Sequence, residues 1–110
     1  MEITAREHKR VVVIRVSGRV DATTTAEFEA KIKEYVTGGH PNLVLELDAA
    51  DYISSAGLRV LISAQKALKA KGGKLVMAQP SDRVKEVMQL AGLDPLFPIF
   101  PDTESAVGAV

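Results

Sequence analysis

Two adjacent serines, Ser54 and Ser55, stand where the sequence changes from an expected loop to a helical pattern, and Gly57 follows in the first expected turn. A serine side chain is a favoured cap for the free backbone N–H groups at the start of a helix. One cap explains one serine only. Glycine in a helix also costs about 1 kcal/mol relative to alanine. The second hydroxyl and the glycine are therefore candidates for a functional role.

The start of a helix is a favourable place for a phosphate group. Free N–H groups and the positive end of the helix dipole stabilise an anion there, and phosphoserine carries about −1.5 to −2 charges at neutral pH. Phosphorylation of Ser55 would add charge and bulk to a surface without unfolding the helix. We expect Gly57 to keep that surface low for a partner. Arg59, four residues after Ser55, is expected on the same helical face.

The other polar residues do not assemble a convincing active site. The chain has no cysteine, which excludes disulfides, thiol nucleophiles and zinc–thiolate sites. His8 and His40 fall in expected turns far apart in the sequence, so neither a metal site nor a Ser-His-Asp triad is predicted. Asp48 and Asp51 lack a nearby histidine or third carboxylate, and we interpret them as solvated loop acids. We expect no enzymatic activity, no metal and no cofactor.

Length, composition and charge indicate one ordinary globular domain. The chain has 110 residues, of which 46% are hydrophobic and 25% are charged, and this fits a single core. The 14 basic and 14 acidic residues give a formal net charge of zero, so the field that attracts nucleic acid is absent. The sequence contains neither a signal peptide nor the roughly 18 apolar residues of a membrane span. We expect a cytoplasmic protein without membrane insertion or nucleic-acid binding.

Apolar periodicity predicts strands that alternate with helices. Strands are expected over residues 11–16, 43–47 and 74–78, with short strands over 3–7 and 98–100, and Gly18 is expected to end the strand over 11–16. Helices are expected after Asp21 as an N-cap, after the two serines, and after residues 81 and 102. This order predicts an α/β domain with a mixed sheet of four or five strands and helices mainly on one side. The expected core includes Phe28, Ile32, Val44, Leu47, Leu58, Leu61, Ile62 and Val76.

The segment around the serines resembles the signature of a known family. Residues 52–61, YISSAGLRVL, look like the signature loop and helix of STAS domains, the sulfate-transporter and anti-sigma-factor-antagonist family. Residues 13–21, 43–48, 73–78 and 84–93 resemble further strands and helices of that family. These motifs occur in order and cover nearly the whole chain. The resemblance therefore implies a single STAS domain over residues 1–110.

The resemblance implies a regulatory binding protein. Free-standing bacterial members are anti-sigma factor antagonists, which bind an anti-sigma factor when unphosphorylated and so free a sigma factor. The anti-sigma factor is also a serine kinase, and phosphorylation at the start of the signature helix dissociates the complex. A PP2C-type phosphatase restores the active form. One phosphate on an exposed helix start fits this switch, because it can turn docking into repulsion.

The resemblance also implies which residues act. The family motif reads Asp-Ser-Ser/Thr-Gly-Leu, with the first serine as the phosphoacceptor. Anchored on Gly57, it places Ser54 at the aspartate position, Ser55 at the phosphoacceptor and Ala56 at the second hydroxyl position. Because the preceding acid is replaced, Ser54 becomes the alternative acceptor.

A partner-binding surface is expected around these residues. Asp21 matches an acidic position at the mouth of the first helix, which the family's fold brings near the signature loop. Its role as an N-cap is compatible with a role in docking. The surface implied by the resemblance consists of Asp21, Ser54, Ala56, Gly57 and Arg59.

Two other roles stay open for a STAS domain. One is a subunit of a lipid-transport or transporter complex, where the fold packs against a membrane-associated machine and need not be phosphorylated. The other is a scaffold component of a signalling assembly. The charge-balanced chain and the intact Ser55 favour the antagonist. A neighbouring gene for a histidine-kinase-like ATPase would favour it further, whereas a permease gene would favour transport.

Overall fold

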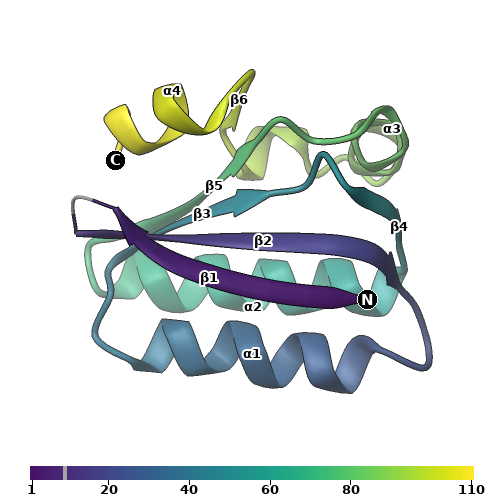
Figure 1. Ribbon diagram of the computed structural model, residues 1–110, viewed down its shortest axis with the longest axis horizontal. Helices are drawn as coiled ribbons and strands as arrows, with labels where there is room; N and C mark the ends of the chain where they lie inside the picture. The colour runs from purple at the N-terminus through teal and green to yellow at the C-terminus, as the bar shows by residue number, and fades with distance from the viewer. Residues whose placement is uncertain (9) are drawn as a thin grey trace.

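The computed structural model describes residues 1–8 and 10–110 (Figure 1). The strands and helices follow one another in the predicted alternation. In chain order they are β1 (Glu2–His8), β2 (Val11–Val20), α1 (Thr25–Thr37), β3 (Asn42–Glu46), β4 (Ala50–Ile53), α2 (Ser55–Ala70), β5 (Lys74–Ala78), α3 (Asp82–Leu90), the 3-10 turn η1 (Asp94–Leu96), β6 (Ile99–Phe100) and α4 (Thr103–Gly108).

The strands of the described residues form one mixed sheet. Its order is β1-β2-β3-β5-β6, and β4 pairs with β2 off this path. β1 is antiparallel to β2, and every other pair is parallel. The hairpin of β1 and β2 pairs without a shift from Glu2–Ser17 to His8–Val11. The predicted mixed sheet is confirmed.

Strand β4 was not predicted, and the sheet has six strands rather than four or five. Residues 51–53 were expected in a loop, and Gly18 was expected to end the preceding strand. Instead β2 continues to Val20 through Gly18, whose φ is 85°. The pairing register with β4 shifts between Gly18 and Arg19. A left-handed glycine thus produces an irregularity and not a break, and the extended β2 gives β4 a partner.

The two long helices cover one face of the sheet. α1 and α2 lie side by side below it in Figure 1, while the short α4 lies over part of the other face. α1 buries Phe28, Ile32 and Val36, one residue per turn, as expected for an amphipathic helix. The prediction that helices pack mainly on one side is confirmed. Across the described residues, no helix is long and apolar enough to cross a membrane.

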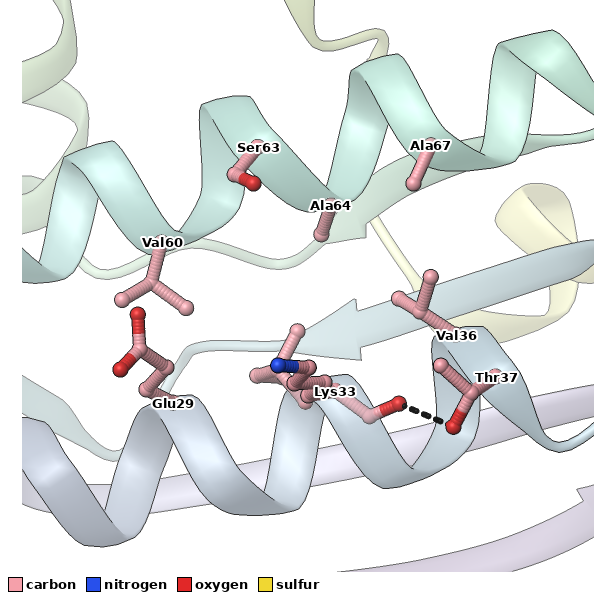
Figure 2. A pocket seen from close by; sticks show the side chains of 9 residues that line it. Glu29, Lys33, Val36, Thr37, Val60, Ser63, Ala64 and Ala67 are labelled. Atoms are coloured by element: carbon pink, nitrogen blue, oxygen red, sulfur yellow. Dashed lines mark hydrogen bonds between the residues drawn. The ribbon is translucent and has the colours of Figure 1, made fainter.

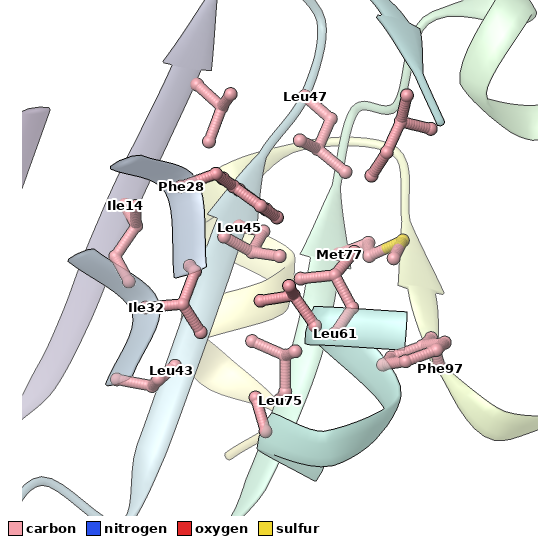
Figure 3. Close-up of a cluster of buried hydrophobic side chains, with 14 of the residues drawn as sticks. Ile14, Phe28, Ile32, Leu43, Leu45, Leu47, Leu61, Leu75, Met77 and Phe97 are labelled. Atoms are coloured by element: carbon pink, nitrogen blue, oxygen red, sulfur yellow. The ribbon is translucent and has the colours of Figure 1, made fainter. Parts of the chain in front are cut away.

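The main apolar core lies between the sheet and the two long helices (Figure 3). Of the predicted core residues, Ile62 is only partly buried and packs against this core. Val44 and Val76 are buried on the other face of the sheet, in a smaller cluster under α4. The remaining predicted residues are buried in the main core, namely Phe28, Ile32, Leu47, Leu58 and Leu61.

A buried carboxylate links three elements on the face that α4 covers. Glu46, the last residue of β3, is 5% exposed and accepts two hydrogen bonds of 3.0 Å from the Arg6 guanidinium on β1. Thr103 of α4 donates its hydroxyl to the same carboxylate, and Arg15 Nη1 lies 3.9 Å away. The hydrogen bonds from Arg6 lower the pKa of Glu46 against the opposing effect of burial, and Thr103 and Arg15 lower it further. Glu46 thus ties the edge strand β1 and helix α4 to the centre of the sheet.

We predict that Arg6→Ala lowers the free energy of unfolding by about 2 kcal/mol, because it leaves a buried carboxylate without its main partner. The value is below that of a fully buried pair because half of the Arg6 side chain is exposed. Arg83→Ala, which removes an exposed arginine of α3, is the control and should change stability by less than about 0.5 kcal/mol. Urea unfolding of both variants measures the difference.

The pH dependence of the same variant tests the assignment to Glu46. A carboxylate with a lowered pKa in the folded state contributes stability above its unfolded pKa and loses it as the pH falls through the folded pKa. The usual value for glutamate is 4.5, so the difference between wild type and Arg6→Ala should shrink below that pH. A difference that stays constant down to about pH 3 would contradict the assignment.

Candidate functional site

The start of α2 is built against the ends of β2 and β4. Ser54 is the single residue between β4 and α2. Its backbone N–H donates to the carbonyl of Val20 over 2.8 Å, and its carbonyl accepts from the N–H of Leu58 over 2.9 Å. These two bonds join the last residue of β2 to the first turn of α2.

The two serines have different surroundings at this helix start. Ser54 is the N-cap residue, and its hydroxyl accepts a hydrogen bond of 3.2 Å from the N–H of Gly57. Ser54 is half-buried, whereas Ser55 is exposed. The first N–H groups of a helix have no partner within the helix, so those of Ser55 and Ala56 remain at its open end. Capping therefore explains Ser54 and leaves the hydroxyl of Ser55 accessible.

Gly57 faces inward, so the expectation that it keeps an exposed surface low is wrong. The residue is buried, and a Cβ atom there would lie 2.9 Å from Cγ1 of Ile53 and 2.9 Å from Cγ1 of Val20. Both neighbours are β-branched and have little freedom at χ1. Gly57 therefore lets the first turn of α2 pack directly on β2 and β4. This packing sets the position of Ser55 relative to the two strands.

Asp21 forms the turn before α1 and does not cap that helix. α1 has Thr24 as its N-cap residue, so the predicted N-cap role of Asp21 is wrong. Its carboxylate accepts from the N–H of Thr23 over 3.0 Å and from the Thr23 hydroxyl over 2.8 Å, which is an Asx-turn. The hydrogen bonds from Thr23 are the main cause of a lowered pKa of Asp21, and Thr24 and Arg19 contribute in the same direction. The carboxylate is therefore ionised at neutral pH.

Arg19 connects the Asp21 turn with the strand before the serines. Its guanidinium carbon lies 4.5 Å from the centre of the Tyr52 ring, and its Nε lies 3.6 Å from the Asp21 carboxylate. Arg19 and Tyr52 are partners in the register of β2 and β4. The turn and the signature loop are thus adjacent, as the resemblance implied. Sequence reasoning missed Arg19 and Tyr52 because it ended β2 at Gly18.

The outer face of α2 leads from the serines to a groove. Arg59 lies four residues after Ser55, and Ser63 lies four residues after Arg59; both are exposed. Ala56, next to Ser55, is half-buried. A groove of about 220 Å³ separates α1 and α2 beside this face (Figure 2). Its lining is mainly aliphatic side chains with a few polar ones, namely Glu29, Ile32, Lys33, Val36, Thr37, Val60, Ser63, Ala64 and Ala67. The groove therefore offers a shaped and mainly aliphatic surface beside the exposed face of α2.

The remaining acidic and histidine residues that the sequence analysis considered include Asp48, Asp51 and His40. Asp48 is exposed in the turn after β3, as expected of a solvated loop acid, and it also accepts hydrogen bonds of 2.8 Å and 3.3 Å from Arg15. Asp51 is exposed on β4, and Nε2 of His40 lies 3.8 Å from Glu7. Within residues 1–8 and 10–110, no group of three or more metal-ligating side chains could hold an ion.

Comparison with known families identifies the family of this chain. The family model described as "STAS domain" matches residues 2–106. The chain belongs to the STAS domain family. BtrV of Bordetella bronchiseptica, an anti-sigma factor antagonist by name, is 32% identical over 99% of this chain and 94% of its own length. The anti-sigma-F factor antagonist RsfB of Mycobacterium tuberculosis is 27% identical over 98% of this chain and 88% of its own length. The resemblance found at the serines is therefore confirmed.

Solved structures confirm the STAS fold. An anti-sigma factor antagonist from Mycobacterium paratuberculosis superposes with a TM-score of 0.90 at 29% identity, covering 99% of this chain and 92% of that one. The antagonist SpoIIAA in its unphosphorylated form gives a TM-score of 0.84 at 24% identity, over 98% and 95% of the two chains. SpoIIAA of Bacillus in its phosphorylated form gives 0.76 at 22% identity, over 98% of each chain.

We predict that Gly57→Ala destabilises the protein by about 1 kcal/mol. The added methyl group must displace Val20 or Ile53, and this overpacking outweighs the gain of roughly 1 kcal/mol in helix propensity. Gly108→Ala in α4 is the matched control, because open space surrounds that position, and it should be neutral or stabilising. Urea unfolding of both variants checks the packing role, which an unchanged or stabilised Gly57→Ala would contradict.

Proposed function

We propose that this protein is an anti-sigma factor antagonist, which binds an anti-sigma factor serine kinase and is switched off by phosphorylation of Ser55. The observation that carries the proposal is the exposed Ser55 beside Ser54, whose hydroxyl is already engaged as the helix cap. Membership of the STAS family and the antagonist names of its relatives support the proposal. In this role the protein is a kinase substrate and a binding module in the cytoplasm, not a catalyst and not a nucleic-acid-binding protein.

Phosphorylation acts on the surface of the protein in this mechanism. A phosphate on Ser55 adds about −1.5 to −2 charges at the positive end of α2, where the N–H groups of Ser55 and Ala56 are available to it. The helix start therefore tolerates the modification. The same face already carries the ionised carboxylate of Asp21 in the adjacent turn. A partner that accepts this face with a neutral serine is repelled by the added charge.

The proposed partner-binding surface combines the helix start with the Asp21 turn. Asp21, Ser54, Ala56 and Arg59 provide the contact residues around Ser55. Gly57 acts through its buried packing, which sets the position of the first turn. Asp21 presents a fixed acceptor, because Thr23 and Arg19 hold its carboxylate. Arg59 places a cation one helical turn beyond Ser55. In the unphosphorylated protein this cation can contact the partner, and in the phosphorylated protein it can pair with the phosphate.

Incubation with ATP and the anti-sigma factor kinase encoded nearest to the gene of this protein should place phosphate on Ser55. Peptide mass spectrometry locates it, and Ser55→Ala should abolish it. Ser54→Ala is the matched control. It should still accept phosphate, although it should lose about 1 kcal/mol of stability with the helix cap. Phosphate on Ser54, or undiminished phosphate on Ser55→Ala, would count against the assignment.

Binding to the same kinase tests the direction of the switch. The unphosphorylated protein and Ser55→Ala should bind with similar affinity in calorimetry, because neither carries the phosphate. The phosphorylated protein should bind at least about tenfold more weakly, since one unfavourable charge contact of roughly 1.4 kcal/mol suffices for that factor. We infer that a PP2C-type phosphatase, added with its metal ion, removes the phosphate and restores binding. Equal affinity of both forms would refute the switch.

A further inference from the structure

The two edges of the sheet differ in how they are protected. β6 has only two residues, Ile99 and Phe100, and lies between Pro98 and Pro101, so it offers little backbone for pairing. β1 has seven residues, contains no proline and pairs with β2 without a register shift. In the part of the chain that the structure describes, no strand pairs with the outer edge of β1. A long regular edge of this kind is a template for another strand.

The side chains of β1 divide between the two faces of the sheet. Ile3, Ala5 and Glu7 stand opposite Val16, Ile14 and Val12 of β2, which face the main core. The alternate residues therefore lie on the face that α4 covers, where Arg6 contacts Glu46. These alternate residues are Glu2, Thr4, Arg6 and His8.

The charge of Arg6, on the face that α4 covers, is neutralised within the chain. Unpaired charges that point inward on an edge strand are one means by which proteins prevent edge-to-edge pairing. Arg6 lacks that effect, because both of its terminal nitrogens donate to the buried Glu46 at 3.0 Å. Arg6 therefore does not repel an incoming strand, and Glu7 is the carboxylate that stays largely exposed on the opposite face of β1.

The sequence of β1 is complementary to itself in one antiparallel register. When Ala5 lies on a twofold axis, Glu2 stands opposite His8, Thr4 opposite Arg6 and Ile3 opposite Glu7, each pair occurring twice by symmetry. No two like charges face each other, and directly opposite residues share a face of the sheet. An axis at Thr4 would place Glu2 opposite Arg6, which is already occupied by Glu46, and would pair fewer residues.

We propose that the protein forms a weak homodimer in which β1 pairs antiparallel with β1 of a second copy, with Ala5 on the twofold axis. The sheet then continues from one subunit into the other. This inference goes beyond the proposed function and needs no kinase. One strand pair buries much less than the roughly 1,600 Å² of a standard interface, so we expect a dissociation constant between about 10 μM and 1 mM.

Disulfide trapping tests the register. The chain has no cysteine, so Ala5→Cys introduces a single thiol. Directly opposite residues of an antiparallel ladder have Cα atoms about 4.5–5.5 Å apart, which suits a disulfide. Mild oxidation of the full chain should therefore convert Ala5→Cys rapidly to a covalent dimer. Ala70→Cys, an exposed alanine on α2, is the matched control and should react slowly. Equal rates for the two variants would overturn the proposal.

Sedimentation equilibrium up to about 1 mM protein tests the charge pairing. The double variant Glu2→Lys, His8→Lys places like charges opposite each other at two symmetric positions and should weaken the dimer by about threefold or more. The double variant Glu2→Lys, His8→Glu places opposite charges at the same positions and should associate at least as strongly as the wild type. A wild-type protein that stays monomeric over the whole range would overturn the proposal. So would a Glu2→Lys, His8→Lys variant that associates as strongly as the wild type.

Discussion

The direct packing of the Gly57 backbone against Val20 and Ile53 determines the geometry of the whole signature region. It brings the first turn of α2 onto the joined ends of β2 and β4, where a side chain of any other residue would separate them. The backbone N–H of Ser54 donates to the Val20 carbonyl over 2.8 Å where these elements meet. The exposed serine and the Asp21 turn are neighbours for the same reason. A buried glycine thus controls an exposed surface.

The length of β2 is the second determinant of this arrangement. Its first residues pair with β1 and β3, and its last residues pair with β4. The irregularity at Gly18 lets one strand serve both pairings. Arg19 and Asp21 follow immediately, so the strand that organises the sheet also delivers the charged residues beside the serines. The order of strands in the sheet and the position of the candidate site therefore both depend on the ten residues of β2.

The sequence predicted the features that depend on local pattern. Apolar periodicity predicted α1 with Phe28 and Ile32 on its buried face, and the two serines located the start of α2. The features that it missed depend on contacts between distant segments. β4 exists because the end of β2 is available to it, and Gly57 is a glycine because Val20 lies beneath it. The role of Glu46 is of the same kind, since its partner Arg6 comes from a strand 40 residues away.

Ser54 caps α2, and Ser55 is the proposed phosphorylation site. This separation of the two roles has a consequence for how fast the proposed switch can respond. The cap hydrogen bond belongs to Ser54, so a covalent change at Ser55 leaves the register and the first turn of α2 in place. In the proposed switch, we therefore expect no segment to fold or unfold when phosphate is added to Ser55 or removed. The response time of that switch would be limited by the rates at which the kinase and the phosphatase encounter the protein and turn over, and each cycle would return the protein to its starting conformation.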